Sequence, residues 1–533
     1  MKKTVFSCLV LVLIPLSLRA QIANSTSLVG TVSDSVGGVI NGSKVTAVEE
    51  STGVQSLAVA NAVGYYAITF IQPGTYDITV ERSGFKTVTK TGVVVPIDQA
   101  VRTDFTLPVG STQTVVTVTA NTPPLSTDDA TLGETFNTRA VEDLPISGHN
   151  ALEIAALASN VYIGSATNYQ GNPPGEDFIG AGQREIQNSL SLDGVSIVNN
   201  LITTTPDHPA ADMISETQMQ SGNYTAQYGA YLGIHINLVS KSGTNNIHGA
   251  VYDYVENTAL NANVFTAAPG SKKQVLHYNQ YGFQVGGPVY IPKLYNGRDK
   301  TFFFGSYEKL NQIGQGSSIV SAITPAMESG NFSAAGIPQL YDPSTGQPYP
   351  NNQIPAAELL TPAAAIAKKY ETYMVTPNLP GVANNLNNAY PSELVIKQSI
   401  DRVDENIGEK VRLYARYYYQ DLTFVNGSNF AANASNGPTN SRNYAIGYTH
   451  VITPSLVNDL HFGVNKLTAE NLNYWYTAGS KMPEPASAFP VLPGTRFTTT
   501  PAFQWLPSLI LPGWAMRAAT GSRTIAPTTY TTN

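Results

Sequence analysis

The chain has 533 residues, a formal net charge of −7 and only 13% charged residues, so its length predicts several domains and its charge gives no basic patch for nucleic acid. Polar uncharged residues replace the missing charge, and no apolar run after the N-terminus is long enough for a transmembrane helix, which excludes a helical membrane protein. The 44 Gly, 34 Pro and 29 Tyr favour strands, turns and interfacial aromatic residues.

The N-terminus has the pattern of a secretory signal peptide over residues 1–20. A basic start at Met1-Lys2-Lys3 precedes an apolar run over 5–18, and cleavage is expected after Ala20. Cys8, the only cysteine of the chain, lies inside this segment. The mature chain is therefore expected to have no disulfide, zinc-thiolate site or cysteine nucleophile, as is usual for an exported protein of the Gram-negative envelope.

Residues 26–108 alternate in short runs between turn residues, which predicts a small β-sandwich. The expected strands are 27–32, 44–48, 65–70, 76–80 and 101–107. Four motifs occur in a fixed order: Gly30-Thr31-Val32, Gly64-Tyr65-Tyr66, Pro73-Gly74-Thr75-Tyr76 and Gly84-Phe85. Together they resemble a carboxypeptidase regulatory-like domain, and the resemblance implies a non-catalytic, prealbumin-like sandwich.

A β-branched segment lies in the following linker, 109–124, before the breaker Pro123-Pro124. Its central residues are Thr114, Val115, Val116, Thr117 and Val118. One interpretation makes the segment a last sandwich strand or plain linker. The other makes it an energy-coupling strand, which would pair with the sheet edge of a periplasmic partner through its main chain.

Residues 125–245 predict a small α+β domain. We expect a short helix over 150–158, a hairpin around Asp193-Gly194, a second helix around 211–214 and a strand over 233–244.

Several motifs in this region resemble the plug domain of TonB-dependent outer-membrane receptors. They are Leu144-Pro145, Leu192-Asp193-Gly194-Val195, Gln227-Tyr228-Gly229-Ala230, the run 239–245 and His248-Gly249. Later motifs at 329–333, 340–346 and 352–356, with the N-terminal sandwich, are similar to the Oar-type branch of that family. The resemblance implies that 114–118 is the TonB box, although Gln113 replaces the usual acid.

The rest of the chain, 246–533, predicts part of an outer-membrane β-barrel. Val411 to Gln420 alternate between an apolar, tyrosine-rich face and a face with Arg412, Tyr414, Arg416, Tyr418 and Gln420. The expected strands are 247–257, 277–290, 301–310, 397–405, 411–422, 441–451 and 455–466. Long and short gaps alternate between them, as between extracellular loops and periplasmic turns.

The longest gap, roughly 311–396, is expected to be an external loop with a helix near 357–372; the alternative is a disordered linker between two soluble domains. The resemblance implies about twenty-two strands, and the chain ends at Thr531-Thr532-Asn533 without a terminal aromatic residue. We therefore expect a truncated chain with an incomplete barrel.

The sequence predicts no catalytic, cofactor or metal site. The seven histidines include no pair at metal-ligand spacing, and we expect structural roles for His235 and His248. Glu405 and Glu409 flank Gly408 in an expected turn and are interpreted as solvated. Asp193-Gly194 is interpreted as a plain hairpin turn.

Together these features predict a non-enzymatic TonB-dependent receptor of the outer membrane, with its N-terminal domain in the periplasm as an accessory module. The resemblance implies a periplasmic TonB-like partner and import or passage of a bulky glycan, peptide or chelate. The alternative is a secreted, multi-domain β-sandwich adhesin or glycan-binding protein.

Overall fold

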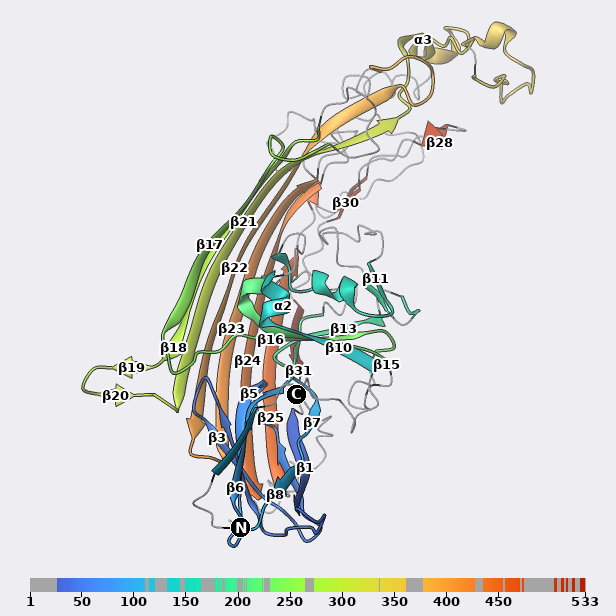
Figure 1. Ribbon diagram of the computed structural model, residues 1–533. Helices are drawn as coiled ribbons and strands as arrows, with labels where there is room; N and C mark the ends of the chain where they lie inside the picture. The colour runs from blue at the N-terminus through green and yellow to red at the C-terminus, as the bar shows by residue number, and fades with distance from the viewer. Residues whose placement is uncertain are drawn as a thin grey trace, which may run out of the picture.

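The computed structural model is built mainly of strands (Figure 1). A long curved sheet forms a wall, a small α+β unit lies against one face of it, and a sandwich lies at one end. We call these parts the wall, the plug and the sandwich. The structure describes residues 26–469 with gaps at 111–114, 120–131, 144–148, 164–177, 181, 185–186, 199–204, 206, 208, 223, 225–230, 264–272, 335, 361–376, 427–434 and 454–455, and beyond 471 only short strands up to 532. The expected signal peptide, Thr114 and most of the expected helix at 357–372 lie outside the described residues.

The sandwich consists of two sheets around a dense apolar core. One sheet has the order β4-β1-β7, with β8 also on β1, and the other has the order β3-β2-β5-β6-β9. The bounds are β1 Ser27–Asp34, β2 Lys44–Glu49, β3 Gln55–Val59, β4 Tyr65–Thr69, β5 Gly74–Glu81, β6 Thr87–Val95, β7 Ala100–Arg102, β8 Phe105–Leu107 and β9 Val115–Thr119. Leu28, Val45, Ile78 and Leu107 have no exposed surface. The predicted sandwich is thus confirmed.

Two sandwich strands were missed in the sequence, and the run at 101–107 is two short strands. The alternation of β6 is interrupted by Gly92, which has a positive φ of 73° next to a register shift in the β5–β6 pair. The segment of β3 is only five residues long. Its burial alternates, but the buried positions hold the small residues Ser56 and Ala58 while Val59 is exposed, so its sequence shows no apolar period of two.

The glycine and tyrosine motifs of the sandwich meet at one point. A Cβ atom on Gly30 would lie 2.1 Å from the carbonyl oxygen of Thr103. The Tyr66 hydroxyl donates to that same oxygen at 2.6 Å. Because only glycine permits this approach, the two motifs hold β1 and β4 against the chain between β7 and β8.

The segment proposed for energy coupling forms β9, which pairs in parallel with β6 at the edge of the five-stranded sheet. Val116 lies opposite Val88, and Val118 lies opposite Lys90. Of the two interpretations, the structure thus shows the one in which this segment is the last sandwich strand. Its role as a coupling strand stays a prediction.

The plug contains one mixed sheet of the order β10-β15-β16-β13-β14. Its elements are β10 Leu132–Asn137, α2 Thr138–Asp143, η2 Glu153–Leu157, β11 Val161–Ile163, β12 Phe178–Gly180, β13 Ser189–Leu192, β14 Val195–Ser196, η4 Ala211–Met213, β15 Ile214–Gly222 and β16 His235–Ser240. The expected hairpin is confirmed: Leu192 pairs with Val195, and both turn residues have positive φ, 49° at Asp193 and 78° at Gly194.

Both predicted helices of the plug are present, but as short 3₁₀ helices. The first is the 3₁₀ helix η2, and the second is the single turn η4, after which the chain enters β15 directly. Thr217 to Gln220 are buried between β10 and β16, so pairing with two strands decides their conformation over any local helical preference.

All seven predicted wall strands are confirmed, and they form one antiparallel sheet in chain order that continues to β31 Thr528–Thr532. The strands are β17 His248–Asn257, β18 Leu276–Pro288, β21 Thr301–Val320, β22 Leu386–Ile407, β23 Val411–Asn426, β24 Ser435–Thr453 and β25 Leu456–Ala469. The expected gap at 311–396 was too long, since the β21–β22 ladder continues to Val320 and Leu386. The alternative of a linker between soluble domains is therefore wrong.

The connections of the wall sort to two ends, as predicted. The turn between β22 and β23 and the small hairpin of β19 Tyr290–Ile291 and β20 Tyr295–Asn296 lie at the end that carries the sandwich (Figure 1). The described parts of the connection between β21 and β22, which include α3 Pro325–Glu328, lie at the opposite end. Within the described residues, no helix has the length and apolar character needed to cross a membrane.

Candidate functional site at the contact of plug and wall

Strand β23 divides its side chains between two environments, as its alternation predicts. Arg416, Tyr418 and Gln420 have at most 3% of their surface exposed and point toward the plug. On the neighbouring strand, the outward-pointing Tyr444 and Ile446 are 50% and 55% exposed. The outer face therefore suits lipid, and the inner face holds polar groups away from solvent.

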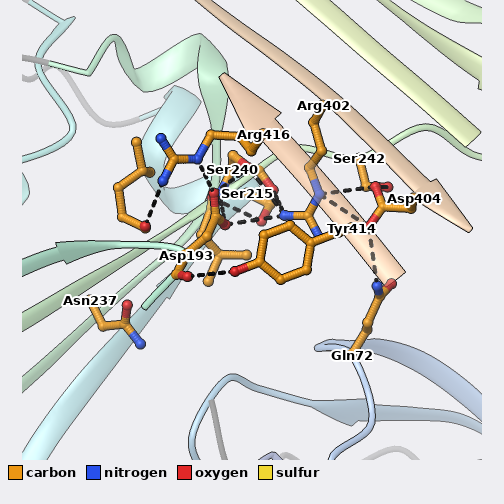
Figure 2. Close-up of polar contacts among 12 residues, drawn as sticks. Gln72, Asp193, Ser215, Asn237, Ser240, Ser242, Arg402, Asp404, Tyr414 and Arg416 are labelled. Atoms are coloured by element: carbon orange, nitrogen blue, oxygen red, sulfur yellow. Dashed lines mark hydrogen bonds and ion pairs between the residues drawn. The ribbon is translucent and has the colours of Figure 1, made fainter. Parts of the chain in front are cut away.

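The centre of the site is Asp193, the turn residue of the plug hairpin (Figure 2). Its carboxylate accepts from Arg402 Nη1 at 3.1 Å and from Arg416 Nε at 3.0 Å. It also accepts from the main-chain N–H and the hydroxyl of Ser240, at 2.9 and 2.8 Å. One plug carboxylate thus joins two wall arginines and the neighbouring plug strand.

Arg402 of β22 is held on its other side by Asp404. Its Nε and Nη2 donate to that carboxylate at 2.8 to 3.1 Å, which is a bidentate ion pair. Asp404 also accepts from Ser242 Oγ at 2.7 Å and from Gln72 Nε2 of the sandwich at 3.4 Å. This carboxylate therefore lies where plug, wall and sandwich meet (Figure 2).

Tyr414 extends the cluster along a cross-strand row of the wall. Its ring passes over Gly447, its partner on β24, to reach His461 on β25, where the hydroxyl and Nδ1 are 3.0 Å apart. The same hydroxyl donates to the carbonyl oxygen of Asp193 at 2.9 Å. His461 Nε2 is 2.9 Å from Asp459 Oδ2, which orients the imidazole.

The cluster is balanced in charge and almost fully buried. Two guanidinium groups, of Arg402 and Arg416, face two carboxylates, of Asp193 and Asp404, and each side chain has at most 8% of its surface exposed. Removal of one partner from a buried ion pair costs several kcal/mol because the other charge stays desolvated. The arrangement therefore fixes the plug to the wall with strong positional specificity.

Sequence reasoning missed this cluster and interpreted Asp193 only as a turn residue. Turn chemistry explains its positive φ, but its carboxylate carries the contact. The available signal was the inward row of Arg412, Tyr414 and Arg416, because arginines on a lumen face that a plug fills need buried acceptors.

The candidate coupling residues Val115 to Val118 lie on the sandwich and not in this cluster.

The other residues singled out in the sequence have structural surroundings. His235 is buried in the plug, where burial lowers its pKa to about 4 and its ring meets Tyr224 edge-on at 4.3 Å. His248 is on the wall, with Nδ1 2.9 Å from the carbonyl oxygen of Asn246. Glu405 was interpreted as solvated but is half-buried and accepts from Thr301, whereas Glu409 is exposed. Among the described residues, no group of three or more acidic, His or Cys side chains could hold a metal ion.

A second polar contact joins plug and wall farther along the strands. Glu308 of β21 accepts from Gln398 at 2.9 Å and from the Tyr252 hydroxyl at 3.1 Å. Next to it, the Tyr254 hydroxyl lies 3.3 Å from Asp212 of the plug, and the Tyr254 ring stacks on His149 at 3.7 Å. The plug is thus held at two levels of the wall.

The sandwich contacts the plug through the turn at 96–99. The main-chain N–H of Ile97 donates to Glu216 at 2.9 Å, and its carbonyl oxygen accepts from Gln218 at 3.0 Å. Asp98 accepts from Asn237 of the plug at 3.1 Å. Burial raises the pKa of Glu216 to about 7, although the Ile97 N–H opposes this shift.

The raised pKa of Glu216 predicts that the contact between sandwich and plug weakens with rising pH. The contact is fully stabilised below the ordinary pKa of 4.5 and loses stability as the pH passes through about 7, by up to about 3 kcal/mol. Limited proteolysis of the 96–99 turn between pH 5 and 8.5 measures this. Glu216→Gln should remove the dependence on pH; an unchanged pH profile in this variant would contradict the prediction.

Comparison with known proteins agrees with this architecture. Residues 239–533 match the family described as outer membrane beta barrel domain, and residues 27–108 match the carboxypeptidase regulatory-like domain. The TonB-dependent transporter Oar of Myxococcus xanthus is 21% identical over 309 residues, which are 54% of this chain and 27% of that protein. The chain thus spans about a quarter of this relative.

Two solved structures are similar in part. The outer-membrane transporter YddB of Escherichia coli is 10% identical with a TM-score of 0.42, and the siderophore receptor PirA of Acinetobacter baumannii is 14% identical with a TM-score of 0.39. Each comparison covers 64% of this chain and 40% of the other.

The barrel-domain match over residues 239–533 defines a protein of the outer membrane whose wall is a β-barrel sheet. The chain belongs to the outer membrane beta barrel family, which matches more than half of its residues. The sequence resemblance to the Oar type and to the carboxypeptidase regulatory-like domain is thereby confirmed.

Proposed function

We propose that the protein is a TonB-dependent transporter whose plug is displaced to let a bulky substrate through the barrel. The observation that carries this proposal is the buried cluster around Asp193, which holds a separate folded unit against the lumen face of the wall. A polar, charge-balanced contact can separate and re-form with its partners still matched. The contact also has an apolar part, because Phe304, Ile400 and Tyr418 of the wall pack in the same buried cluster as apolar plug residues, and displacement of the plug must expose these side chains.

The order of strands supports a route for the pulling force. β9 is the edge strand of its sandwich sheet and β10 is the edge strand of the plug sheet, and they follow each other in the chain. A TonB-like protein that paired with 115–119 would unzip β9 from β6 and then pull β10 away from β15. Neither step breaks the interior of a sheet.

The substrate class proposed from the resemblance is a bulky glycan, peptide or chelate. Import and outward passage use the same plug movement, so the geometry serves either direction. The rival function, a secreted adhesin made of separate sandwiches, conflicts with a wall whose strands form one sheet with an apolar outer face. Extraction of membranes with urea tests this, because a barrel protein should stay in the membrane and an adhesin should wash off.

Proline in place of Val116 should abolish binding of a TonB-like C-terminal domain, since proline cannot donate to a new strand pair. The measurement is co-purification from outer membranes. Val59→Pro is the matched control, because Val59 is an exposed residue of β3 at the other edge of the same sheet.

Both proline variants remove pairing from an edge strand of the sandwich, so both should lower the midpoint temperature of its thermal unfolding by similar amounts. Only Val116→Pro should lose the partner. Equal loss in both variants would show that sandwich stability, rather than a coupling strand, decides binding.

A further inference from the structure

The sandwich, which the sequence predicted as an accessory module in the periplasm, is held by the wall as well as by the plug. Arg412, at the sandwich end of β23, donates from Nη1 to the carbonyl oxygen of Phe70 at 2.8 Å and from Nη2 to the hydroxyl of Ser56. Both acceptors belong to the sandwich. Gln72 reaches Asp404 from the same region of the sandwich.

A second attachment lies where the plug leads into the first wall strand. The main-chain N–H of Asn245 donates to the carbonyl oxygen of Ser51 at 3.0 Å. The side-chain Nδ2 of Asn245 donates to the carbonyl oxygen of Thr52 at 2.6 Å. Asn245 also donates to Asp299 of the wall at 2.6 Å. With the turn at 96–99, the sandwich is thus attached at three separate points.

Between these attachments lies a partly open cavity of about 610 Å³ that all three parts line. The sandwich lines it with Glu49 and Phe70, the plug with Lys241, and the wall with Arg412 and Asp459. Because the sandwich lies at the end of the short turns (Figure 1), it covers this cavity on the periplasmic side.

We propose that the sandwich is a second gate, which closes the periplasmic mouth of the barrel below the plug and must leave before cargo can pass. This inference rests on the proposed transport function. Its attachments are polar contacts to main-chain and side-chain oxygens, so they can exchange with water when the sandwich moves away. The cavity is then the space between two gates.

The position of β9 gives the two gates an order. The proposed coupling strand belongs to a sheet of the sandwich, and it precedes the plug in the chain. A pull on β9 therefore acts on the sandwich before it reaches β10 of the plug.

A disulfide between sandwich and wall tests the closed gate. The N–O distance between Asn245 and Ser51 brings the two residues within disulfide reach, and the only native cysteine is Cys8. In outer membranes, the double variant Ser51→Cys/Asn245→Cys should form an intramolecular disulfide that changes mobility on a non-reducing gel. Each single variant should form none. Absence of the disulfide in folded protein would overturn the proposal.

Opening is measured by the rate of this cross-link. Arg412→Ala should lower the rate about tenfold, because two charge-assisted hydrogen bonds hold the gate shut. Arg412→Lys keeps the charge and should have a smaller effect. It controls for loss of the cross-link through misfolding. Arg442→Ala is the control, since Arg442 pairs with Asp421 on the wall. Equal rates in all variants would show a fixed sandwich and overturn the gate.

Collapse of the proton gradient separates the gate from the transport function. If pulling opens the gate, an uncoupler should raise the cross-linking rate in cells. If the rate responds to Arg412→Ala but not to the uncoupler, the gate stands and the energised function proposed above fails.

Discussion

Replacement of Asp193 by alanine should release the plug from the wall. Arg416 has Asp193 as its carboxylate partner and Arg402 has it as one of two, so alanine leaves desolvated guanidinium charge next to the hairpin. The expected cost is about 3–5 kcal/mol, the usual cost of breaking a buried ion pair. Heat-modifiable mobility and protease resistance of the plug in outer membranes measure this loss.

A double-variant cycle distinguishes lost charge from lost packing. Asp193→Asn keeps the shape and should be nearly as harmful as alanine, because both arginines remain. Asp193→Asn combined with Arg416→Met removes one charge of each sign and should recover much of the stability. If the double variant is as unstable as the sum of the single ones, the ion pair does not hold the plug.

Valine in place of Gly447 should be nearly as damaging. A Cβ atom at this position would lie 2.1 Å from Cε1 of Tyr414, so the ring must leave the row that leads to His461. Its hydroxyl then loses both Asp193 and His461. We expect a loss of about 3 kcal/mol from overpacking and lost hydrogen bonds, measured as the urea midpoint of plug release.

Gly305→Ala is a control for an added Cβ atom in the same sheet. Its added Cβ would meet only Asp401 Oδ1, at an ordinary 3.4 Å, and should be tolerated. Truncation of Tyr414 to alanine in the Gly447→Val background should relieve the steric part of the effect. Without that relief, the clash with Tyr414 cannot be the cause.

The wall and the sandwich could be predicted because period-two alternation is a local property. Residues 411–420 show this best: their inward row was assigned from the sequence and meets the sandwich at Arg412 and the plug at Tyr414, Arg416 and Tyr418. The strand ends were underestimated, because the outer part of the β21–β22 ladder is set by pairing between strands rather than by local pattern.

The site could not be predicted because its members are far apart in the sequence. Asp193 and Arg416 are separated by 223 residues, and neither position shows which charge it will meet. The helix expected around 211–214 is only the single turn η4 for a related reason, since the residues that follow it pair with strands on both sides. Docking of the sandwich depends on the main-chain oxygens of Ser51, Thr52 and Phe70. Because every residue has such an oxygen, the sequence does not show which ones accept.

The charges around Asp193 also determine the electrostatic potential on the inner face of the wall once the plug has moved away. With the hairpin gone, Arg402 keeps Asp404, whereas Arg416 loses the carboxylate of Asp193 and keeps its hydrogen bond to Asn443. This part of the inner face of the wall would then carry one excess positive charge, which attracts anions and repels cations. The carboxylate that anchors the hairpin is, in this sense, also the counterion that keeps this part of the wall electrically neutral.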